Sequence, residues 1–313
     1  MNKITVIGTG SVGATIAYTL TVSGVASDIV MIDINGEKAL GEALDIRQGT
    51  PFCNPANVKA GNYEDAAGSD IVVITSGIAR KPGQTRLELT QTNVNIIKSV
   101  ADNIVKHAPD ATYVIVSNPV DVLTYVFCKY TGIPESRVIG SGTVLDTARL
   151  RSRIAEYYSV SQHNVHAYFL GEHGDSGFVP WSIANISNVP VEKFRESVLN
   201  NEQYPEFKAS EVEEYVRKSG ARVISRKGAT YYAVSMSVCH ICKCLLSGID
   251  TTLTVSTMLH GEYGIEDVCM SLLNVVGKDG AHSKVLLPLS DSEVEALKHS
   301  ADCLKEVIKS ITV

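Results

Sequence analysis

The fold is decided near the N-terminus, by a β-branched run that leads into three closely spaced glycines: Ile4-Thr5-Val6-Ile7-Gly8-Thr9-Gly10-Ser11-Val12-Gly13. The run predicts a buried strand, and the residues from about position 12 onward predict a helix. In such a unit the glycines permit a tight turn, close approach of the backbone to a pyrophosphate, and close packing of helix on strand. The helix N-terminus then faces the phosphates. The pattern predicts a dinucleotide site that includes Gly8, Gly10, Ser11, Val12 and Gly13.

An acidic residue follows at the spacing that this site needs. Asp33 ends the next β-branched run, twenty residues beyond Gly13, where a carboxylate can accept hydrogen bonds from an adenosine ribose. The same carboxylate would repel a 2′-phosphate, and residues 34–36 supply no arginine to bind one. The sequence therefore predicts NAD rather than NADP. The alternative is a glycine-rich turn followed by an Asp that caps a helix.

The first half of the chain alternates short apolar runs with helical stretches. We expect strands at residues 4–7, 29–32, 71–75 and 113–116, with helices from about 12, after 35 and at about 87–107. This rhythm predicts an α/β protein with a Rossmann-type, doubly wound parallel sheet. The strand runs are apolar throughout, as expected when helices cover both faces. We assign residues 1–140 to an NAD-binding domain.

The second half, residues 141–313, predicts an α+β substrate domain that carries the catalytic residues. We expect helices at 145–158 and 221–246, short strands near 165–170, a polar stretch around 200–214, and strands at 251–257 and 268–276. Ser290 and Glu293 have the spacing of a capping box, which opens a last amphipathic helix. The two halves are expected to share one large interface.

Composition narrows the classes of partner. The 313 residues include 28 Lys+Arg and 34 Asp+Glu, a formal charge of −6, so no basic field favours nucleic acid. Apolar runs fall far short of the roughly 18 residues of a membrane helix, and the N-terminus enters a strand at once. Seven cysteines without framework spacing suit reduced thiols. We expect a cytoplasmic protein that binds neither nucleic acid nor a membrane.

One cluster of cysteines invites a metal or redox interpretation: Cys239-His240-Ile241-Cys242-Lys243-Cys244. It lies inside the predicted helix at 221–246, and no second CxxC or His pair nearby completes four zinc ligands. We predict packing of small apolar side chains and no metal.

Three polar segments fall where loops should leave the sheet. Residues 77–86 place Arg80, Lys81 and Arg86 among glycines and a proline, as in a mobile lid for an anion. Asp146 and Arg149 are three apart, on one face of a helix, and His173 stands between glycines after an apolar strand. Taken singly, these segments also fit a solvated basic loop, a surface ion pair and a surface histidine.

Together the segments resemble, in order, the motifs of the NAD-dependent L-lactate/L-malate dehydrogenases. The motifs are residues 8–13, Lys81-Pro82-Gly83-Gln84-Thr85-Arg86, Ser117-Asn118-Pro119-Val120-Asp121, Leu145-Asp146-Thr147-Ala148-Arg149 and Gly171-Glu172-His173-Gly174-Asp175-Ser176. The resemblance extends from the N-terminus to the last helix. It implies an NAD-dependent enzyme that reversibly transfers hydride between NADH and a short 2-oxo acid.

The resemblance also implies roles for individual residues. His173 would be the general acid/base, and Asp146 would orient its ring and favour the protonated form. Arg149 would hold the substrate carboxylate through two parallel hydrogen bonds.

Three other implied positions complete this site. Arg86 would polarise the carbonyl as negative charge develops there. Asn118 would help to place both the carbonyl and the nicotinamide, and Thr230 would line the pocket.

Two features of the resemblance indicate different substrates. Arg80 stands at the lid position where malate dehydrogenases have arginine and lactate dehydrogenases usually have glutamine. The surrounding motifs, residues 140–143, Glu172 and residues 228–234, have forms typical of bacterial lactate dehydrogenases. An unpaired arginine opposite the methyl group of pyruvate would be unfavourable, although a lid arginine can turn back into water. We predict pyruvate and L-lactate, with oxaloacetate and L-malate as the alternative that Arg80 favours.

The resemblance raises two further points. In allosteric bacterial lactate dehydrogenases, an arginine and a histidine at the positions of Arg151 and His166 bind fructose 1,6-bisphosphate across a subunit interface, so this effector and a homotetramer, or a homodimer, are implied. A surface arginine and a strand histidine are the alternative.

An NAD-binding module without catalysis is the competing class, and it predicts loss of His173, Asp146, Arg149 or Arg86. All four are present.

Overall fold

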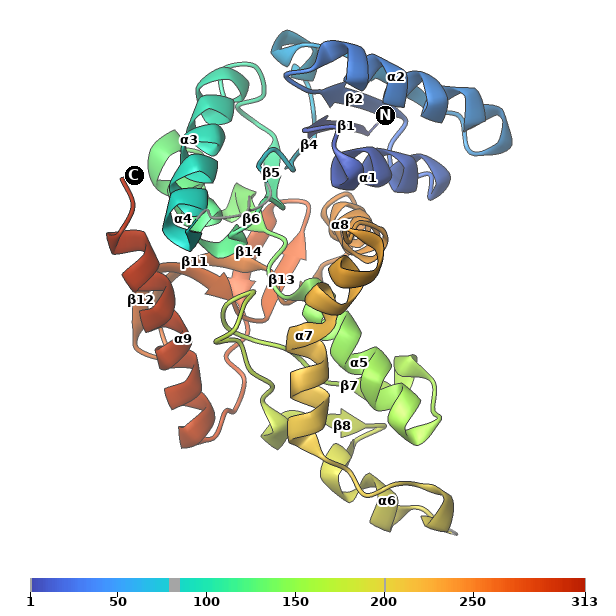
Figure 1. Cartoon of the computed structure of the whole chain (residues 1–313), viewed down its shortest axis with the longest axis vertical. Coiled ribbons are helices and arrows are strands. Elements are labelled where there is room, and N and C mark those ends of the chain that lie inside the picture. Colours follow the sequence, from blue (N-terminus) through green and yellow to red (C-terminus); the bar gives the residue numbers. More distant parts are fainter. Residues whose placement is uncertain (1, 79–84, 200, 313) are drawn as a thin grey trace.

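An eight-stranded sheet forms the centre of the computed structural model, which describes residues 2–78, 85–199 and 201–312 (Figure 1). Its strands are β1 (Lys3–Ile7), β2 (Asp28–Ile32), β3 (Asn57–Ala60), β4 (Ile71–Ile74), β5 (Thr112–Ile115), β6 (Val138–Gly140), β11 (Ser256–Glu262) and β12 (Ile265–Ser271). The order across the sheet is β12-β11-β6-β5-β4-β1-β2-β3. The pairings among β1 to β6 are parallel, and β11 and β12 continue the sheet in antiparallel fashion.

Helices cover both faces of this sheet. The helices are α1 (Ser11–Val22), α2 (Gly36–Gly49), α3 (Arg86–Ile104), α4 (Val120–Thr131), α5 (Val144–Tyr158), α6 (Phe194–Ser197), α7 (Ala209–Lys227), α8 (Tyr232–Leu245) and α9 (Asp291–Lys309). On one face, Ile4 and Val6 of β1 pack with side chains of α1 and α8. On the other face, Ile7 packs with side chains of α3 and α4. The predicted doubly wound, Rossmann-type sheet is therefore confirmed.

Two small sheets belong to the second half. Strands β7 (Val165–His166), β8 (Asn185–Ile186) and β9 (Val189–Pro190) form one, and β10 (Thr251–Leu253), β13 (Asn274–Gly277) and β14 (Gly280–Lys284) form the other. The strands expected at 251–257 and 268–276 are each divided between two sheets, because β11 and β12 pair with each other and the large sheet while β10 and β13 pair separately.

The second half is joined to the first by shared structure rather than by a linker. Strand β11 pairs with β6 at Ser256 and Gly140, and α8 lies against α1 (Figure 1). The expected large interface is thus a continuous sheet edge together with a helix pair.

The helix predicted at residues 221–246 is wrong in one respect. It is two helices, α7 and α8, separated at residues 228–231, where Gly228 takes a positive φ of 83°. Such a backbone conformation favours glycine and ends a helix. The first of the two helices, α7, begins at Ala209 and so includes the last residues of the polar stretch expected at 200–214. By contrast, Ser290 and Glu293 do form the predicted capping box of α9.

The cysteine cluster packs as predicted. Cys239, Cys242 and Cys244 lie on α8, are buried, and belong to the core between this helix and the sheet. Burial raises the pKa of the Cys242 thiol, which keeps it protonated.

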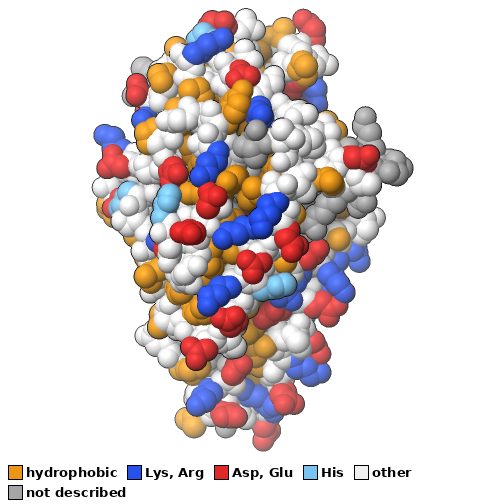
Figure 2. Space-filling view, turned by 90° about the vertical axis from the view of Figure 1, so that its left-hand side faces the viewer, with side chains coloured by type: hydrophobic (Ala, Val, Ile, Leu, Met, Phe, Trp, Pro, Cys, Tyr) orange, Lys and Arg blue, Asp and Glu red, His pale blue; other side chains and the backbone are white. Residues whose placement is uncertain are grey.

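Among the described helices, none is long and apolar enough to cross a membrane. One face of the molecule carries intermixed basic and acidic side chains (Figure 2).

Candidate active site

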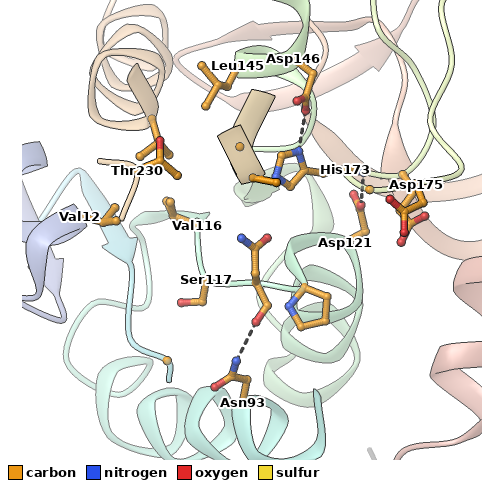
Figure 3. Close-up of a pocket in the computed structure, with 18 of the residues that line it drawn as sticks. Val12, Asn93, Val116, Ser117, Asp121, Leu145, Asp146, His173, Asp175 and Thr230 are labelled. Carbon is orange, nitrogen blue, oxygen red and sulfur yellow. Dashed lines mark hydrogen bonds and ion pairs between the residues drawn. The ribbon is translucent and has the colours of Figure 1, made fainter. Parts of the chain in front are cut away.

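A cavity of about 670 Å³ opens where the carboxyl ends of β4 and β5 meet the second half of the chain. In a parallel sheet with helices on both faces, this edge is where ligands bind. The lining includes six residues that the sequence singled out: Val12, Asn118, Asp146, Arg149, His173 and Thr230. Segments distant in the sequence therefore meet at one site, and Figure 3 shows Val12 and Thr230 on one side of it and His173 on another.

His173 and Asp146 form a close polar contact in the cavity. The Nδ1 atom of His173 lies 2.5 Å from Oδ2 of Asp146 (Figure 3). The other carboxylate oxygen, Oδ1, accepts a hydrogen bond of 3.0 Å from Nη1 of Arg149. The i,i+3 spacing on α5 brings Asp146 and Arg149 together, so one nearly buried carboxylate organises both cationic side chains.

The close charges shift the pKa values of His173 and Asp146 in opposite directions. Burial by itself lowers the pKa of His173, but the adjacent Asp146 carboxylate outweighs burial and raises this pKa to about 9. Burial by itself raises the pKa of Asp146, but His173 and Arg149 bring it below its usual value. At neutral pH, His173 is therefore a cation beside an ionised Asp146.

Two sets of hydrogen bonds fix the loop that carries His173, residues 171–177. Leu170 and Phe178 exchange backbone hydrogen bonds of 2.9 and 3.0 Å. The backbone N–H of His173 donates to Oδ2 of Asp121, at 2.8 Å. Asp121 lies on α4 and is 2% exposed, and burial raises its pKa to about 6. A buried carboxyl group thus fixes the backbone of the histidine.

Asn118 follows β5, and its backbone is positioned by another amide. Asn93 on α3 donates from Nδ2 to the carbonyl of Asn118 at 2.8 Å (Figure 3). The same Asn93 side chain accepts a hydrogen bond from the backbone N–H of Ile78 through Oδ1, at 2.9 Å. One buried amide therefore links the segments that follow β4 and β5.

The glycines after β1 shape the turn at the start of α1, where only Val12 of the predicted dinucleotide residues lines the cavity. Gly8 has φ +94°, and a Cβ on Gly13 would lie 1.8 Å from the carbonyl oxygen of Gly8. Gly13 therefore lets α1 touch the turn. A Cβ on Gly10, in contrast, would meet no described atom within 4 Å. This open space, at the start of α1, fits a pyrophosphate held by backbone N–H groups.

Asp33 directly follows β2 and contacts the glycine turn. Its Oδ2 accepts hydrogen bonds from the backbone N–H of Thr9, at 2.6 Å, and from the Thr9 hydroxyl, at 3.1 Å. Its Oδ1 accepts from the N–H of Asn35 at 2.9 Å. Although burial opposes ionisation, these bonds lower the pKa of Asp33. The carboxylate is therefore ionised and fixed next to the glycine turn.

Not every predicted residue belongs to the described cavity. Arg80 and the side chain of Arg86 lie outside the described residues. Arg151 and His166 are described but do not line the cavity. Arg151 donates from Nε to the carbonyl of Ala167, the residue after His166, at 3.1 Å. Within the described residues, no group of three or more His, Cys, Asp or Glu residues is placed to hold a metal ion.

The sequence interpretation gave no role to three residues that line the cavity: Asp121, Asn93 and Arg217. Asp121 stood inside a quoted motif, but nothing in its spacing shows that it reaches the backbone of residue 173. Asn93 lies on the helix expected at about 87–107, and Arg217 lies between the polar stretch expected at 200–214 and the helix expected at 221–246. A polar residue in such places normally faces water. Only the packing of α3 and α7 turns them inward.

Two family models together match nearly the whole chain. The model of the lactate/malate dehydrogenase NAD binding domain matches residues 2–140, and that of the lactate/malate dehydrogenase alpha/beta C-terminal domain matches residues 143–313.

Individual relatives match over their full length. The L-lactate dehydrogenase of Thermoanaerobacterium saccharolyticum is 46% identical over 313 residues, covering 100% of both chains. That of Acetivibrio thermocellus is 43% identical and covers 100% of this chain and 98% of the relative. A solved lactate dehydrogenase from a Medee basin deep-sea metagenome library has a TM-score of 0.94 at 40% identity, covering 99% of this chain and 98% of that one. The minor L-lactate dehydrogenase of Enterococcus mundtii has a TM-score of 0.93 at 36% identity, covering 100% and 99%.

Proposed function

The chain belongs to the lactate/malate dehydrogenase family, and from that premise we propose that it interconverts pyruvate and L-lactate with NADH and NAD. It is an NAD-dependent oxidoreductase that acts on a small 2-oxo or 2-hydroxy acid. The observation that most directly supports this proposal is the 2.5 Å contact between His173 and Asp146 inside the cavity. Residues 1–140 act as the NAD-binding domain and residues 141–313 as the catalytic domain.

His173 moves the proton. Because Asp146 occupies Nδ1, the other ring nitrogen, Nε2, exchanges a proton with the substrate oxygen. With a pKa raised to about 9, the ring is protonated at neutral pH and ready to donate as the 2-oxo group is reduced. In the reverse direction, the neutral ring accepts the proton of the 2-hydroxyl group. Asp146 fixes the orientation of the ring in both directions.

Arg149 orients the substrate. Among the described residues it uses Nη1 to bind Asp146, which leaves guanidinium donors to bind the substrate carboxylate in parallel. The role implied for Arg86 is to stabilise the charge that develops on the carbonyl oxygen. Thr230 and Asn118 complete the wall of the pocket, and Asn118 also contacts the nicotinamide.

The turn between β1 and α1 holds the cofactor. Gly8, Gly10 and Gly13, with the backbone of Ser11 and Val12, bind the pyrophosphate, and Asp33 binds the adenosine ribose. The bound cofactor supplies the hydride or accepts it. The fixed negative charge of Asp33 favours NAD over a phosphorylated dinucleotide.

Oxaloacetate and L-malate form the second candidate pair, because Arg80 can pair with a second carboxylate. The lactate-type residues around the site and the full-length relatives named L-lactate dehydrogenase favour pyruvate. The deciding experiment measures kcat/KM with NADH for pyruvate and oxaloacetate, on the wild type and on Arg80→Gln. We expect the wild type to prefer pyruvate by more than about tenfold, with little change in Arg80→Gln. A wild-type preference for oxaloacetate that Arg80→Gln reverses would assign the malate reaction instead.

Regulation and assembly extend this proposal. We infer that fructose 1,6-bisphosphate binds at Arg151 and His166 and activates the enzyme by stabilising a homotetramer over a homodimer. The hydrogen bond of Arg151 to Ala167 and the exposure of His166 support a phosphate site on this surface. Pyruvate kinetics and oligomer mass that do not change with millimolar effector would disprove it.

We also place the enzyme in the cytoplasm. All seven cysteines are free, which suits a reducing compartment. Cell fractionation with an activity assay tests this location, and activity in the secreted fraction would contradict it.

A further inference from the structure

A chain of hydrogen bonds joins α7 to the loop that carries His173. Arg217 on α7 donates from Nε and from Nη2 to the carbonyl of Gly177, at 3.1 and 2.9 Å. Its Nη2 also donates to Oε2 of Glu213, one turn earlier, at 2.9 Å. The other oxygen of Glu213, Oε1, accepts a hydrogen bond from Nε1 of Trp181 at 2.5 Å. Arg217 is thus held in place and holds the end of the loop.

Gly177 has little freedom to move independently of the catalytic residue. A Cβ built on it would lie 2.3 Å from Cε1 of Phe169 and 2.4 Å from the carbonyl oxygen of Glu172. The loop therefore folds back so that its last residue touches the residue before His173. A displacement of the Gly177 carbonyl is transmitted to Glu172 and hence to the backbone of His173.

The same helix forms a wall of the cavity. Gly220, Ala221 and Ile224 of α7 line it together with Arg217. Arg217 accordingly ties the cavity wall to the loop, whereas Asp121 holds the loop from α4.

A different role for Arg217 would be to attract an anionic substrate as a second cation. Its donors argue against that role, because Nε and Nη2 are directed at the Gly177 carbonyl and the Glu213 carboxylate offsets its charge. The hydrogen-bond geometry instead fixes the position of a backbone carbonyl.

We propose that Arg217 is a positioning residue for His173, because its guanidinium fixes Gly177 and thereby the loop that presents the acid/base group to the substrate. This inference rests on the proposed function. Because Arg149, on α5, holds the substrate carboxylate, loss of Arg217 slows proton transfer more than it weakens substrate binding.

The test compares Arg217→Met, Arg217→Lys and the control Arg222→Met. Arg222 lies on the same helix, with its guanidinium 4.9 Å from the ring centre of Tyr215, and does not line the cavity. We expect Arg217→Met to lower kcat for pyruvate by at least about tenfold, with KM for pyruvate and NADH changed less than about threefold. Arg217→Lys should remain impaired, since one ammonium cannot reproduce the two bonds to Gly177. Arg222→Met should match the wild type.

Two results would overturn the proposal: wild-type kcat in Arg217→Met, or a defect confined to KM for pyruvate that Arg217→Lys repairs. Backbone hydrogen exchange in the ligand-free proteins provides a second readout. We expect backbone exchange across residues 170–178 to be faster than in the wild type in Arg217→Met but not in Arg222→Met. Equal exchange rates in the two variants would also refute the proposal that Arg217 fixes this loop. Because exchange needs no turnover, an inactive wild type would refute the proposed function and leave this comparison decisive for Arg217.

Discussion

At the scale of single residues, the proposed chemistry depends on Asp146, whose two carboxylate oxygens contact different partners. Oδ2 of Asp146 contacts His173 and Oδ1 contacts Arg149. The pairing raises the proton affinity of the histidine while the carboxylate stays ionised. Both effects stabilise the protonated ring that reduction of a 2-oxo acid requires.

The substitution Asp146→Asn tests this electrostatic role. Without the carboxylate, burial is the dominant effect on the pKa of His173, and burial lowers it. The alkaline limb of kcat/KM for pyruvate should move to lower pH by at least about one unit, with at least about a tenfold loss at pH 8. Glu156→Gln removes an exposed carboxylate from the same helix and should keep the wild-type profile. An unshifted limb in Asp146→Asn would show that another group raises this pKa.

Sequence alone predicted His173, Asp146 and Arg149 as site residues because the family motifs contain them, and the structure brings the three together in one cavity. It could not identify Asp121 as the group that binds the backbone of His173. That contact joins residues 52 positions apart and depends on how α4 packs beneath the loop. A buried carboxyl group leaves no local pattern in the sequence.

At the scale of secondary-structure elements, the turn from β1 into α1 separates two functions of glycine. Gly13 serves packing, since its Cβ would collide with the carbonyl of Gly8, whereas Gly10 faces open space. The sequence predicted this unit in full, because strand, glycines and helix are adjacent in the chain. It did not predict the break between α7 and α8, because apolar and helix-favouring residues flank Gly228 on both sides. That break places Thr230 in the cavity.

Alanine at each glycine should separate packing from cofactor binding. Gly13→Ala forces a Cβ to within 1.8 Å of a backbone oxygen and should lower Tm by several degrees, since overpacking costs about 1–3 kcal/mol or more. Gly10→Ala should leave Tm within about 1 °C of the wild type and weaken NADH binding at least tenfold, because the methyl group occupies the space of the pyrophosphate. Thermal unfolding and NADH fluorescence titration measure the two effects. Wild-type NADH affinity in Gly10→Ala would place the pyrophosphate elsewhere.

At the scale of the whole molecule, the two proposed domains share one sheet. β11 extends the sheet at β6, and α8 completes the core over α1. Sequence reasoning predicted the parallel part from its regular alternation. It could not predict the antiparallel extension, because the pairing of Ser256 with Gly140 joins strands more than a hundred residues apart.

The shared core predicts one cooperative transition. Neither half can unfold without exposing apolar side chains of the other, so calorimetry of the ligand-free protein should show a single peak. Two separate peaks would mean that the halves are independent folding units.

The central claim is that a protonated His173, held by Asp146, exchanges its proton with a 2-oxo acid as hydride is transferred. The most direct measurement is the pH dependence of kcat/KM for the wild type in both directions, with pyruvate and NADH and with L-lactate and NAD. Because the pKa of His173 is about 9, pyruvate reduction should fall as pH rises through that value, while L-lactate oxidation should rise toward it. Parallel profiles in the two directions, or no turnover of either substrate, would contradict the account.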